Sequence, residues 1–360
     1  MKTRYSIAED ISEASTLPGE FYRDAEAFEA MRERVFARSW QWLGHENEIE
    51  RGHVRPLNLL DGCLNEPVVL TRDETGELRC LSNVCTHRAN IIATESGACK
   101  KLRCRYHGRR FALDGKFDFM PEFEGAANFP RAADDLPSVA LKSVQGFLFA
   151  SLDPKHPIES LSGDMLGQIG QLPLSEAKLD PTSSRDYIFD ANWALYVDNF
   201  LEGFHVPYIH PGLIETLDYE NYRTELFELS NLQVGVAKGA GPVFELRAAG
   251  EGAHEQVAAA YYWLYPNTMF NVYPWGISIN VVNPLAVDRT RVSFYSYVWN
   301  SELQEQGAGG ALDQVQAEDE EVVLQVQRGI GSRLYKRGRY SPARETAVHH
   351  FHRLLCSDLA

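Results

Sequence analysis

The sequence lacks a long apolar run. None of its hydrophobic stretches approaches the roughly 18 residues that a membrane-spanning helix needs. The first ten residues contain Glu9 and Asp10 and lack the apolar core of a secretory signal. We therefore expect a location in the cytoplasm and no membrane as a partner.

Positive charge is also scarce. The 360 residues hold 35 Lys and Arg against 50 Asp and Glu, for a formal net charge of −15. Such a chain has no general basic surface for a phosphate backbone, which argues against nucleic acid as a partner. The exception is one run of positive side chains: Lys100, Lys101, Arg103, Arg105, Arg109 and Arg110.

Cysteine is infrequent, and four of the six cysteines lie within residues 80–104. In a cytosolic protein such clustering favours metal or redox chemistry over disulfides. Two thiolates and two imidazoles suit a [2Fe-2S] centre with both Cys on one iron and both His on the other. A structural zinc site is the alternative, although zinc motifs more often pair like ligands with like. The candidates form C-x-H and C-x-x-H motifs: Cys85, His87, Cys104 and His107. Cys80 and Cys99 match no ligand position, and we expect them to be buried structural thiols.

A second group of ligand-type side chains lies at the end of a predicted helix. Residues 192–206 predict an amphipathic helix with three polar residues opposite its apolar stripe: Asp198, Glu202 and His205. Pro207 discourages regular helix at the residue before it. A bend there would bring His205 and His210 to one metal ion.

Two histidines need a carboxylate to complete the facial triad of a non-haem Fe(II) site. Asp319 falls near the centre of an apolar helical stripe, whereas Glu318 and Glu320 lie to either side of it. A carboxylate on a buried face is costly unless it is paired or binds a metal. Asp319 is therefore the predicted third ligand, and a buried acid paired with an Arg is the alternative.

The length of the chain favours two domains. Residues 1–40 predict a helical segment, with a helix over 25–40, that packs on the second domain. Residues 41–155 alternate short apolar runs with turn signals, as in a small antiparallel β domain. Residues 156–360 combine a β-rich stretch with helices before and after it.

The motifs resemble those of a known family. Cys85-Thr-His-Arg-Ala89 and Cys104-Arg-Tyr-His-Gly108 are similar to the Rieske motifs of ring-hydroxylating oxygenases. Residues 192–213 and 265–267 resemble the catalytic half of the alpha subunits, of the choline monooxygenase-like kind. The resemblance implies an α+β fold: a small antiparallel β Rieske domain, and a catalytic domain with a curved antiparallel sheet and helices, of the helix-grip type.

The resemblance also implies roles for the ligand-type residues. Cys85 and Cys104 would hold one cluster iron, and His87 and His107 the other. The mononuclear Fe(II) would be bound by His205, His210 and Asp319. Glu202 matches the acidic residue that joins His107 of a neighbouring subunit to that iron, which implies a homotrimer. The sequence departs from the family pattern at three positions: Arg105, Arg109 and Ala194.

These expectations together indicate a terminal oxygenase that uses O2. Neither a glycine fingerprint for NAD nor a phosphate-binding loop is present, so a separate ferredoxin or flavoprotein reductase must supply the electrons. The basic run at residues 100–110 would steer that partner to the cluster. A merely solvated or subunit-facing loop is the alternative interpretation.

The substrate is less determined by the sequence. Aromatic side chains can enclose a quaternary ammonium group through cation–π attraction, and they are also ordinary sheet packing. Hydroxylation or N-demethylation of a small quaternary ammonium compound therefore competes with hydroxylation of an aromatic ring. A Rieske electron-transfer protein without catalysis is the alternative from another class. The aromatic residues of the predicted strands are Tyr261, Tyr262, Trp263, Tyr265, Tyr273, Trp275, Tyr295, Tyr297 and Trp299.

Overall fold

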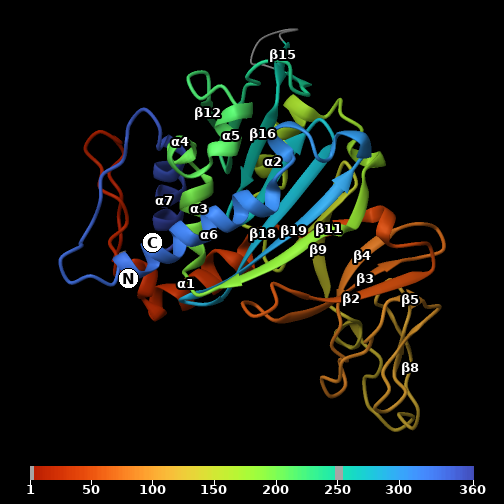
Figure 1. The fold of residues 1–360 in the computed structure, drawn as a ribbon. Coiled ribbons are helices and arrows are strands. Elements are labelled where there is room, and N and C mark those ends of the chain that lie inside the picture. Colours follow the sequence, from red (N-terminus) through yellow and green to blue (C-terminus); the bar gives the residue numbers. More distant parts are fainter. Residues whose placement is uncertain (1–3, 248–253) are drawn as a thin grey trace. The chain divides into compact units, whose positions relative to one another are not determined.

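The computed structural model describes residues 4–247 and 254–360. The chain forms two compact units, one from residues 1–36 and 156–360 and the other from residues 37–155 (Figure 1). In the described part of the chain, no helix is both long and apolar enough to cross a membrane.

The unit of residues 37–155 is built from antiparallel strands. A seven-stranded sheet has the order β1-β10-β9-β4-β3-β2-β5, and a smaller sheet has the order β6-β7-β8. Gln145 and Gly146 connect β9 to β10 with φ angles of 51° and 90°, the left-handed pair that a tight hairpin turn requires. The strands are β1 Gln41–His45, β2 His53–Leu59, β3 Glu66–Arg72, β4 Leu78–Ser82, β5 Gly97–Ala98, β6 Leu102–Arg103, β7 Arg110–Phe111, β8 Phe117–Phe119, β9 Ser138–Val144 and β10 Phe147–Ser151.

Strand alternation gives this unit an apolar core on each face of β3. Val68 and Leu70 pack with Leu148 in one cluster. Val69 packs in the other cluster, which also contains the buried side chains of Cys85 and Cys104. The second core therefore extends to the loops that carry both cysteine motifs.

The unit of residues 1–36 and 156–360 is centred on a seven-stranded antiparallel sheet in the order β11-β19-β18-β17-β16-β13-β12, with a separate β14-β15 hairpin. The curved sheet and its helices confirm the predicted α+β fold class (Figure 1). The strands are β11 Lys178–Phe189, β12 Arg223–Leu226, β13 Ser230–Gly235, β14 Phe244–Arg247, β15 His254–Val257, β16 Ala259–Leu264, β17 Thr268–Tyr273, β18 Gly276–Ala286 and β19 Arg289–Val298. The α-helices are α1 Ala25–Arg34, α2 Glu159–Ile169, α3 Trp193–Phe200, α4 Val206–Ile209, α5 Pro211–Thr216, α6 Leu312–Gly329 and α7 Thr346–Asp358.

Adjacent residues of β16 show which helices cover each face of this sheet. The Tyr262 hydroxyl hydrogen-bonds to Gln168 of α2 at 2.9 Å. The next ring along the strand, Trp263, packs at 5.3 Å from Phe351 of α7. Because successive side chains of a strand point to opposite faces, α2 covers one face and α7 the other. Figure 1 shows α3 and α6 on the α7 side.

Two helices are shorter than the sequence predicts. α1 begins after Asp24, whose carboxylate accepts from two backbone N–H groups, but it ends at Arg34 and is followed by a short 3-10 turn, Phe36–Arg38. α3 ends at Phe200 rather than at 206. Immediately beyond it, the Glu202 carboxylate accepts the backbone N–H of His205 at 3.0 Å. A side chain that bonds to nearby backbone in this way competes with the helix, so the chain turns before Pro207.

Candidate functional site

The two cysteine motifs form loops of the same construction. In the first, the N–H of Cys85 donates to the carbonyl of Asn90, and the carbonyl of Cys85 accepts from Ala89. In the second, the N–H of Cys104 donates to Arg109 and its carbonyl accepts from Gly108. Ala89 and Gly108 occupy the same loop position, with φ angles of 54° and 78°. Each loop therefore presents one Cys and one His from an equivalent backbone frame.

The side chains of these loops converge as one donor set. The Nδ1 atoms of His87 and His107 are 3.2 Å apart, and both thiols are buried. Burial raises the pKa of the Cys85 thiol, and the neighbouring Cys104 raises it further. A buried thiolate needs a cation beside it. Burial, followed by the neighbouring His107, lowers the pKa of His87, which favours the neutral imidazole that binds a metal. Two thiols and two imidazoles are the donors that a [2Fe-2S] centre with mixed ligands requires.

The other cysteines lie outside this donor set. Cys80 is buried in the opposite core of the same unit, as predicted. Cys99 is only partly buried, which is less than predicted: it packs against the core that contains Cys85 and Cys104, and its thiol lies 3.3 Å from the carbonyl oxygen of Lys101.

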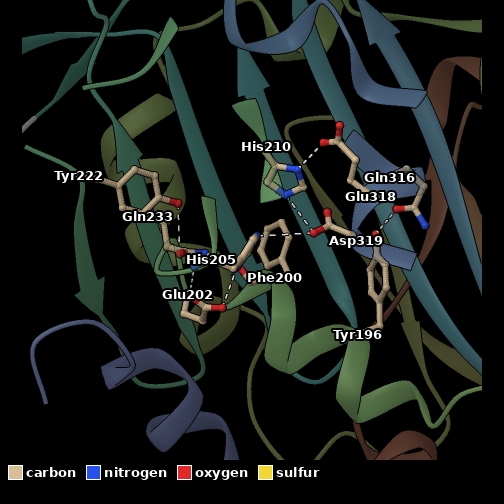
Figure 2. A network of polar contacts seen from close by, with 10 residues as sticks. All are labelled: Tyr196, Phe200, Glu202, His205, His210, Tyr222, Gln233, Gln316, Glu318 and Asp319. Atoms are coloured by element: carbon tan, nitrogen blue, oxygen red, sulfur yellow. Dashed lines mark hydrogen bonds and ion pairs between the residues drawn. The ribbon is translucent and has the colours of Figure 1, made fainter. Parts of the chain in front are cut away.

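The second predicted group also converges, in the unit centred on the curved sheet (Figure 2). One ligand atom from each of His205, His210 and Asp319 lies within 4.8 Å of the other two. Asp319 Oδ1 is 3.0 Å from His210 Nε2 and 3.5 Å from His205 Nε2. Ligand atoms that share one six-coordinate ion lie about 3 Å apart. The donor set of two imidazoles and one carboxylate on one side therefore fits an Fe(II) ion with open positions.

Short helices place the two imidazoles. His205 directly precedes α4, and His210 lies between α4 and α5, so each ring is at the beginning of a helix. Pro207 and Pro211 occupy the first turns of these helices, where a missing N–H costs nothing. The predicted bend therefore consists of the N-termini of two short helices, and Asp319 of α6 lies opposite their histidines.

A carboxylate holds the outer nitrogen of each imidazole. Glu202 Oε1 lies 2.7 Å from His205 Nδ1, and Glu318 Oε2 lies 2.7 Å from His210 Nδ1 (Figure 2). A carboxylate accepts the Nδ1–H, so Nε2 of each ring is left as the lone-pair donor. In the sequence, Glu318 is distinguished only as a less favourable ligand candidate than Asp319. Its position next to Asp319 was the available signal for this supporting role.

Asp198 does not lie on the polar face that the sequence predicts for α3. The sequence places it with Glu202 and His205 on one polar face, but the helix ends before Glu202. Asp198 instead contacts buried partners: its carboxylate accepts from the Tyr22 hydroxyl at 2.8 Å and lies 2.8 Å from His352 Nε2. The residue belongs to the packing between α3 and α7.

An aromatic cavity of about 100 Å³ adjoins the three ligand-type residues. The sheet contributes one face, in which Tyr261, Asn271 and Tyr273 are cross-strand or same-face neighbours. Of the nine aromatic residues named from the sequence, Tyr261 and Tyr273 line this cavity. Four further aromatic side chains complete the wall, and sequence analysis missed them as wall residues: Tyr196, Phe200, Tyr222 and Phe294.

Arg109 does not belong to the exposed basic patch that the sequence predicts. Its side chain is only 2% exposed, and its Nη2 donates to the carboxylate of Asp134 at 2.7 Å. The guanidinium also packs against the rings of Phe111, Phe117 and Phe129. Arg109 is a buried core residue and cannot steer a partner. The exposed members of the run are Lys100, Lys101, Arg103 and Arg105, with Arg110 half-exposed.

Comparisons with known proteins agree with both centres. Residues 39–130 match the model of the Rieske [2Fe-2S] domain, and residues 176–358 match the model of the ring hydroxylating alpha subunit (catalytic domain). The chain is 31% identical to choline monooxygenase of Arabidopsis thaliana, over 97% of this chain and 84% of the relative. It is 30% identical to the carnitine monooxygenase oxygenase subunit of Escherichia coli K12, over 95% and 93% of the two chains.

Solved structures show the same fold. A quaternary ammonium Rieske monooxygenase superposes with a TM-score of 0.81 at 24% identity, over 99% of both chains. Naphthalene 1,2-dioxygenase from a Rhodococcus species superposes with a TM-score of 0.72 at 20% identity, over 95% of this chain and 93% of that one.

Proposed function

Because the chain belongs to the Rieske oxygenase alpha subunits, whose members carry a [2Fe-2S] cluster and a mononuclear iron, we propose that it is the terminal oxygenase for a small quaternary ammonium compound. Family membership makes it an oxidoreductase that uses O2, and excludes the zinc interpretation of the cysteine motifs. The observation that carries the proposal is the convergence of His205, His210 and Asp319 at the wall of an aromatic cavity.

The proposal assigns each ligand-type residue. Cys85 and Cys104 bind one iron of the cluster, and His87 and His107 bind the other. The mononuclear iron is bound by His205, His210 and Asp319. An iron held by these three residues would supply the chemistry of O2 activation, and a cluster held by the other four would supply its electrons.

Residues around the iron ligands keep that site in one geometry. Glu202 holds the ring of His205 through its Nδ1–H, and Glu318 does the same for His210. Tyr196 donates to Gln316 at 2.6 Å, which ties α3 to α6 beside Asp319. Aromatic side chains line the space next to these ligands, where substrate would lie.

The cavity wall supports a cationic substrate. Its acidic members are Glu202 and Asp319, its imidazoles are those of His205 and His210, and no Lys or Arg is among the lining residues that the structure describes. Tyrosine rings around this space attract a quaternary ammonium group through cation–π contact. The relatives named above act on choline and carnitine, which are both of this class. An apolar aromatic substrate fits the same rings, so ring hydroxylation is the second candidate.

Iron analysis and oxygen consumption test the proposal. The purified protein should be red-brown and hold about three irons per chain, two in the cluster and one at the triad. With a reductase present, choline, carnitine and glycine betaine should each be compared with benzoate and naphthalene. O2 uptake that depends on an ammonium compound supports the proposal, whereas uptake with the aromatic compounds alone transfers the assignment to ring hydroxylation.

We further propose a homotrimer in which Glu202 joins the iron site to His107 of a neighbouring chain. The side chain of Glu202 is 15% exposed, and the rings of His87 and His107 are both partly exposed. Two exposed rings beside Glu202, those of Phe204 and Tyr208, offer an apolar surface for such a contact.

Mixed assemblies test this arrangement. Cys104→Ser removes a cluster ligand and His205→Ala removes an iron ligand, so each variant alone should be inactive. Co-expression of the two should restore part of the activity, because an intact cluster on one chain then faces an intact iron site on another. Co-purified mixed assemblies that stay inactive would contradict electron transfer between chains. The cytoplasmic location stays a prediction.

A further inference from the structure

A second cavity, of about 290 Å³, lies in the same unit as the iron pocket. We call it the vestibule. Its wall combines β11, β19 and the segment of residues 304–314 that leads into α6. Unlike the aromatic pocket, it is lined mainly by polar side chains, among them Ser183, Gln304 and Asp313.

The vestibule and the iron pocket share a thin wall. The side chain of Leu312 lines both cavities. Ala308 lines the pocket, and Gly309, the next residue, lines the vestibule. Tyr273 of the pocket stacks on Trp275 of the vestibule with ring centroids 5.3 Å apart. One leucine, two small residues and a stacked ring pair therefore separate the two spaces.

Helix α6 runs from this wall to the ligand Asp319. Leu312, Val315, Gln316 and Asp319 all line the iron pocket, at the i, i+3, i+4 and i+7 spacing that places residues on one helix face. Seven residues of helix advance about 10 Å. One continuous helix face thus connects the vestibule to the metal ligands.

The opposite end of the pocket is formed by Glu202 and His205. The proposed contact with a neighbouring chain would cover that end. Substrate must then arrive from another side, and the vestibule meets the pocket at the end away from Glu202.

We propose that the vestibule is the route by which substrate reaches the iron pocket, with Leu312 as the side chain it must pass. This inference rests on the proposed function. The vestibule suits a small organic cation: Glu305 and Asp313 supply negative charge, and the indole of Trp275 supplies an aromatic face. Its one cationic side chain among the described lining residues, Arg185, is held by backbone carbonyls of Thr182 and Ser184.

The test blocks the vestibule without touching the pocket. Ala311 is exposed and lines the vestibule alone, so Ala311→Trp should fill it. Ala317→Trp is the matched control, because Ala317 is exposed on α6, which begins directly after Ala311, and lines neither cavity. Choline binding is followed by stopped-flow fluorescence in the full protein without O2, and iron content and cluster absorption are checked for each variant.

The binding kinetics differ according to whether the vestibule is the path of the substrate or only part of the surface that binds it. A blocked route slows entry and exit equally, so Ala311→Trp should lower the association and dissociation rate constants roughly fivefold or more at an unchanged Kd. Leu312→Ala should raise both rate constants. An association rate equal to that of Ala317→Trp would overturn the inference, and so would a changed Kd at an unchanged association rate.

A probe that does not depend on the substrate class distinguishes failure of the proposed route from failure of the proposed function. Imidazole binds to a metal whatever the natural substrate, and its binding to the Co(II)-loaded triad is visible by absorption. If choline fails to bind the unaltered protein, the substrate assignment fails, and the imidazole rates of the same variants still test the route. Equal imidazole rates in Ala311→Trp and Ala317→Trp would then overturn it.

Discussion

Glu318 is a supporting residue that the structure adds to the proposed iron site. It accepts a hydrogen bond from Gln314 at 2.9 Å with one oxygen and contacts His210 Nδ1 with the other. Glu318→Gln keeps an acceptor at that position and removes the charge. Since partners of metal-bound imidazoles contribute about 10- to 100-fold to metal affinity, we expect Co(II) titration of the iron-free protein to show binding weakened by at least roughly tenfold.

Glu321→Gln is the control for this substitution. Glu321 is exposed on the same helix, and its carboxylate accepts from the Gln325 amide. The two variants remove the same charge from α6. Equal Co(II) affinities in both would show that Glu318 does not support the iron site.

Arg109 and Asp134 make a buried ion pair of unequal exposure. The Arg109 side chain is 2% exposed and that of Asp134 is 17% exposed. Without its partner, Asp134 can be hydrated, whereas Arg109 remains a buried charge. We therefore expect Asp134→Ala to cost roughly 3–5 kcal/mol of unfolding free energy and Arg109→Met to cost less. Urea unfolding followed by the visible dichroism of the cluster measures the order, and the reverse order would refute the argument.

The same pair predicts how stability depends on acid. Burial alone would raise the pKa of Asp134, but hydrogen bonds from the Arg109 side chain and the Arg131 backbone outweigh it and hold the pKa below the usual 3.8. A carboxyl with a lowered pKa stabilises the fold above its unfolded pKa. That contribution is lost as the pH falls below 3.8 through the lowered value. Asp134→Asn should flatten the pH dependence of unfolding in this range, while a profile parallel to the parent protein would contradict it.

At the residue scale, the grouping of ligand-type side chains was predictable and their surroundings were not. The convergence of His205, His210 and Asp319 could be predicted because ligand types at a bend and a carboxylate on an apolar stripe are unusual in sequence, and their binding of iron stays a prediction. Arg109 was misjudged because a run of charges does not show which member meets an acid and aromatic rings from distant strands. The same limit hid four of the six aromatic residues of the pocket wall, which come from three separate elements.

The break between α3 and α4 is the segment on which the proposed iron site depends. Gly203 lies in it, and a Cβ there would be 2.4 Å from the ring of Tyr222. That ring is fixed, since its hydroxyl donates to Gln233 at 3.1 Å. We expect Gly203→Ala to lower the free energy of unfolding by roughly 1–3 kcal/mol through overpacking. It should also weaken Co(II) binding, because Glu202 and His205 lie on either side of Gly203.

Gly212→Ala provides the comparison. Gly212 lies in α5 close to His210, and a Cβ there would meet nothing within 4 Å. Alanine in a helix should raise stability by roughly 0.5–1 kcal/mol. Thermal unfolding and Co(II) titration of both variants distinguish steric pressure from a general effect of losing glycine. A Gly203→Ala protein that behaves like Gly212→Ala would disprove the steric conflict with Tyr222.

At the element scale, helix existence was predictable and helix length was not. Apolar periodicity correctly located α3 and α6. It carried α3 six residues too far, because periodicity does not register a Glu202 carboxylate that takes the backbone N–H of His205. Asp198 was consequently assigned to the wrong face, although its real partners, Tyr22 and His352, are contributed by the two ends of the chain.

Over the whole molecule, the charge is unevenly distributed. A chain with a net charge of −15 carries exposed Lys100, Arg103 and Arg105 on the loops beside the cluster. We propose that they attract an acidic reductase. Arg103→Glu with Arg105→Glu should slow cluster reduction at low salt and reduce its salt dependence, because steering by charge is screened at high ionic strength.

Arg289→Glu with Arg333→Glu is the control for this prediction. Both side chains are exposed and lie in the other unit, so this pair of reversals lowers the net charge as much as the first pair does and leaves the cluster loops unchanged. Stopped-flow reduction by the reductase is compared across salt concentrations. If the control variant slowed cluster reduction as much as Arg103→Glu with Arg105→Glu does, the effect would come from net charge, and the cluster loops would not direct the partner.

Helix α6 has one further consequence, which concerns substrate length. Its pocket-facing positions from Leu312 to Asp319 span about 10 Å, with the proposed metal ligand Asp319 at one end and Leu312 at the other. Under the proposed function, a molecule whose reacting methyl or ring lies next to Asp319 can extend only as far as Leu312 before it enters the vestibule. Substrate range should therefore be adjustable by size changes at Leu312 and Val315, a full helical turn or more from the ligand, which offers a way to redesign selectivity without disturbing the metal.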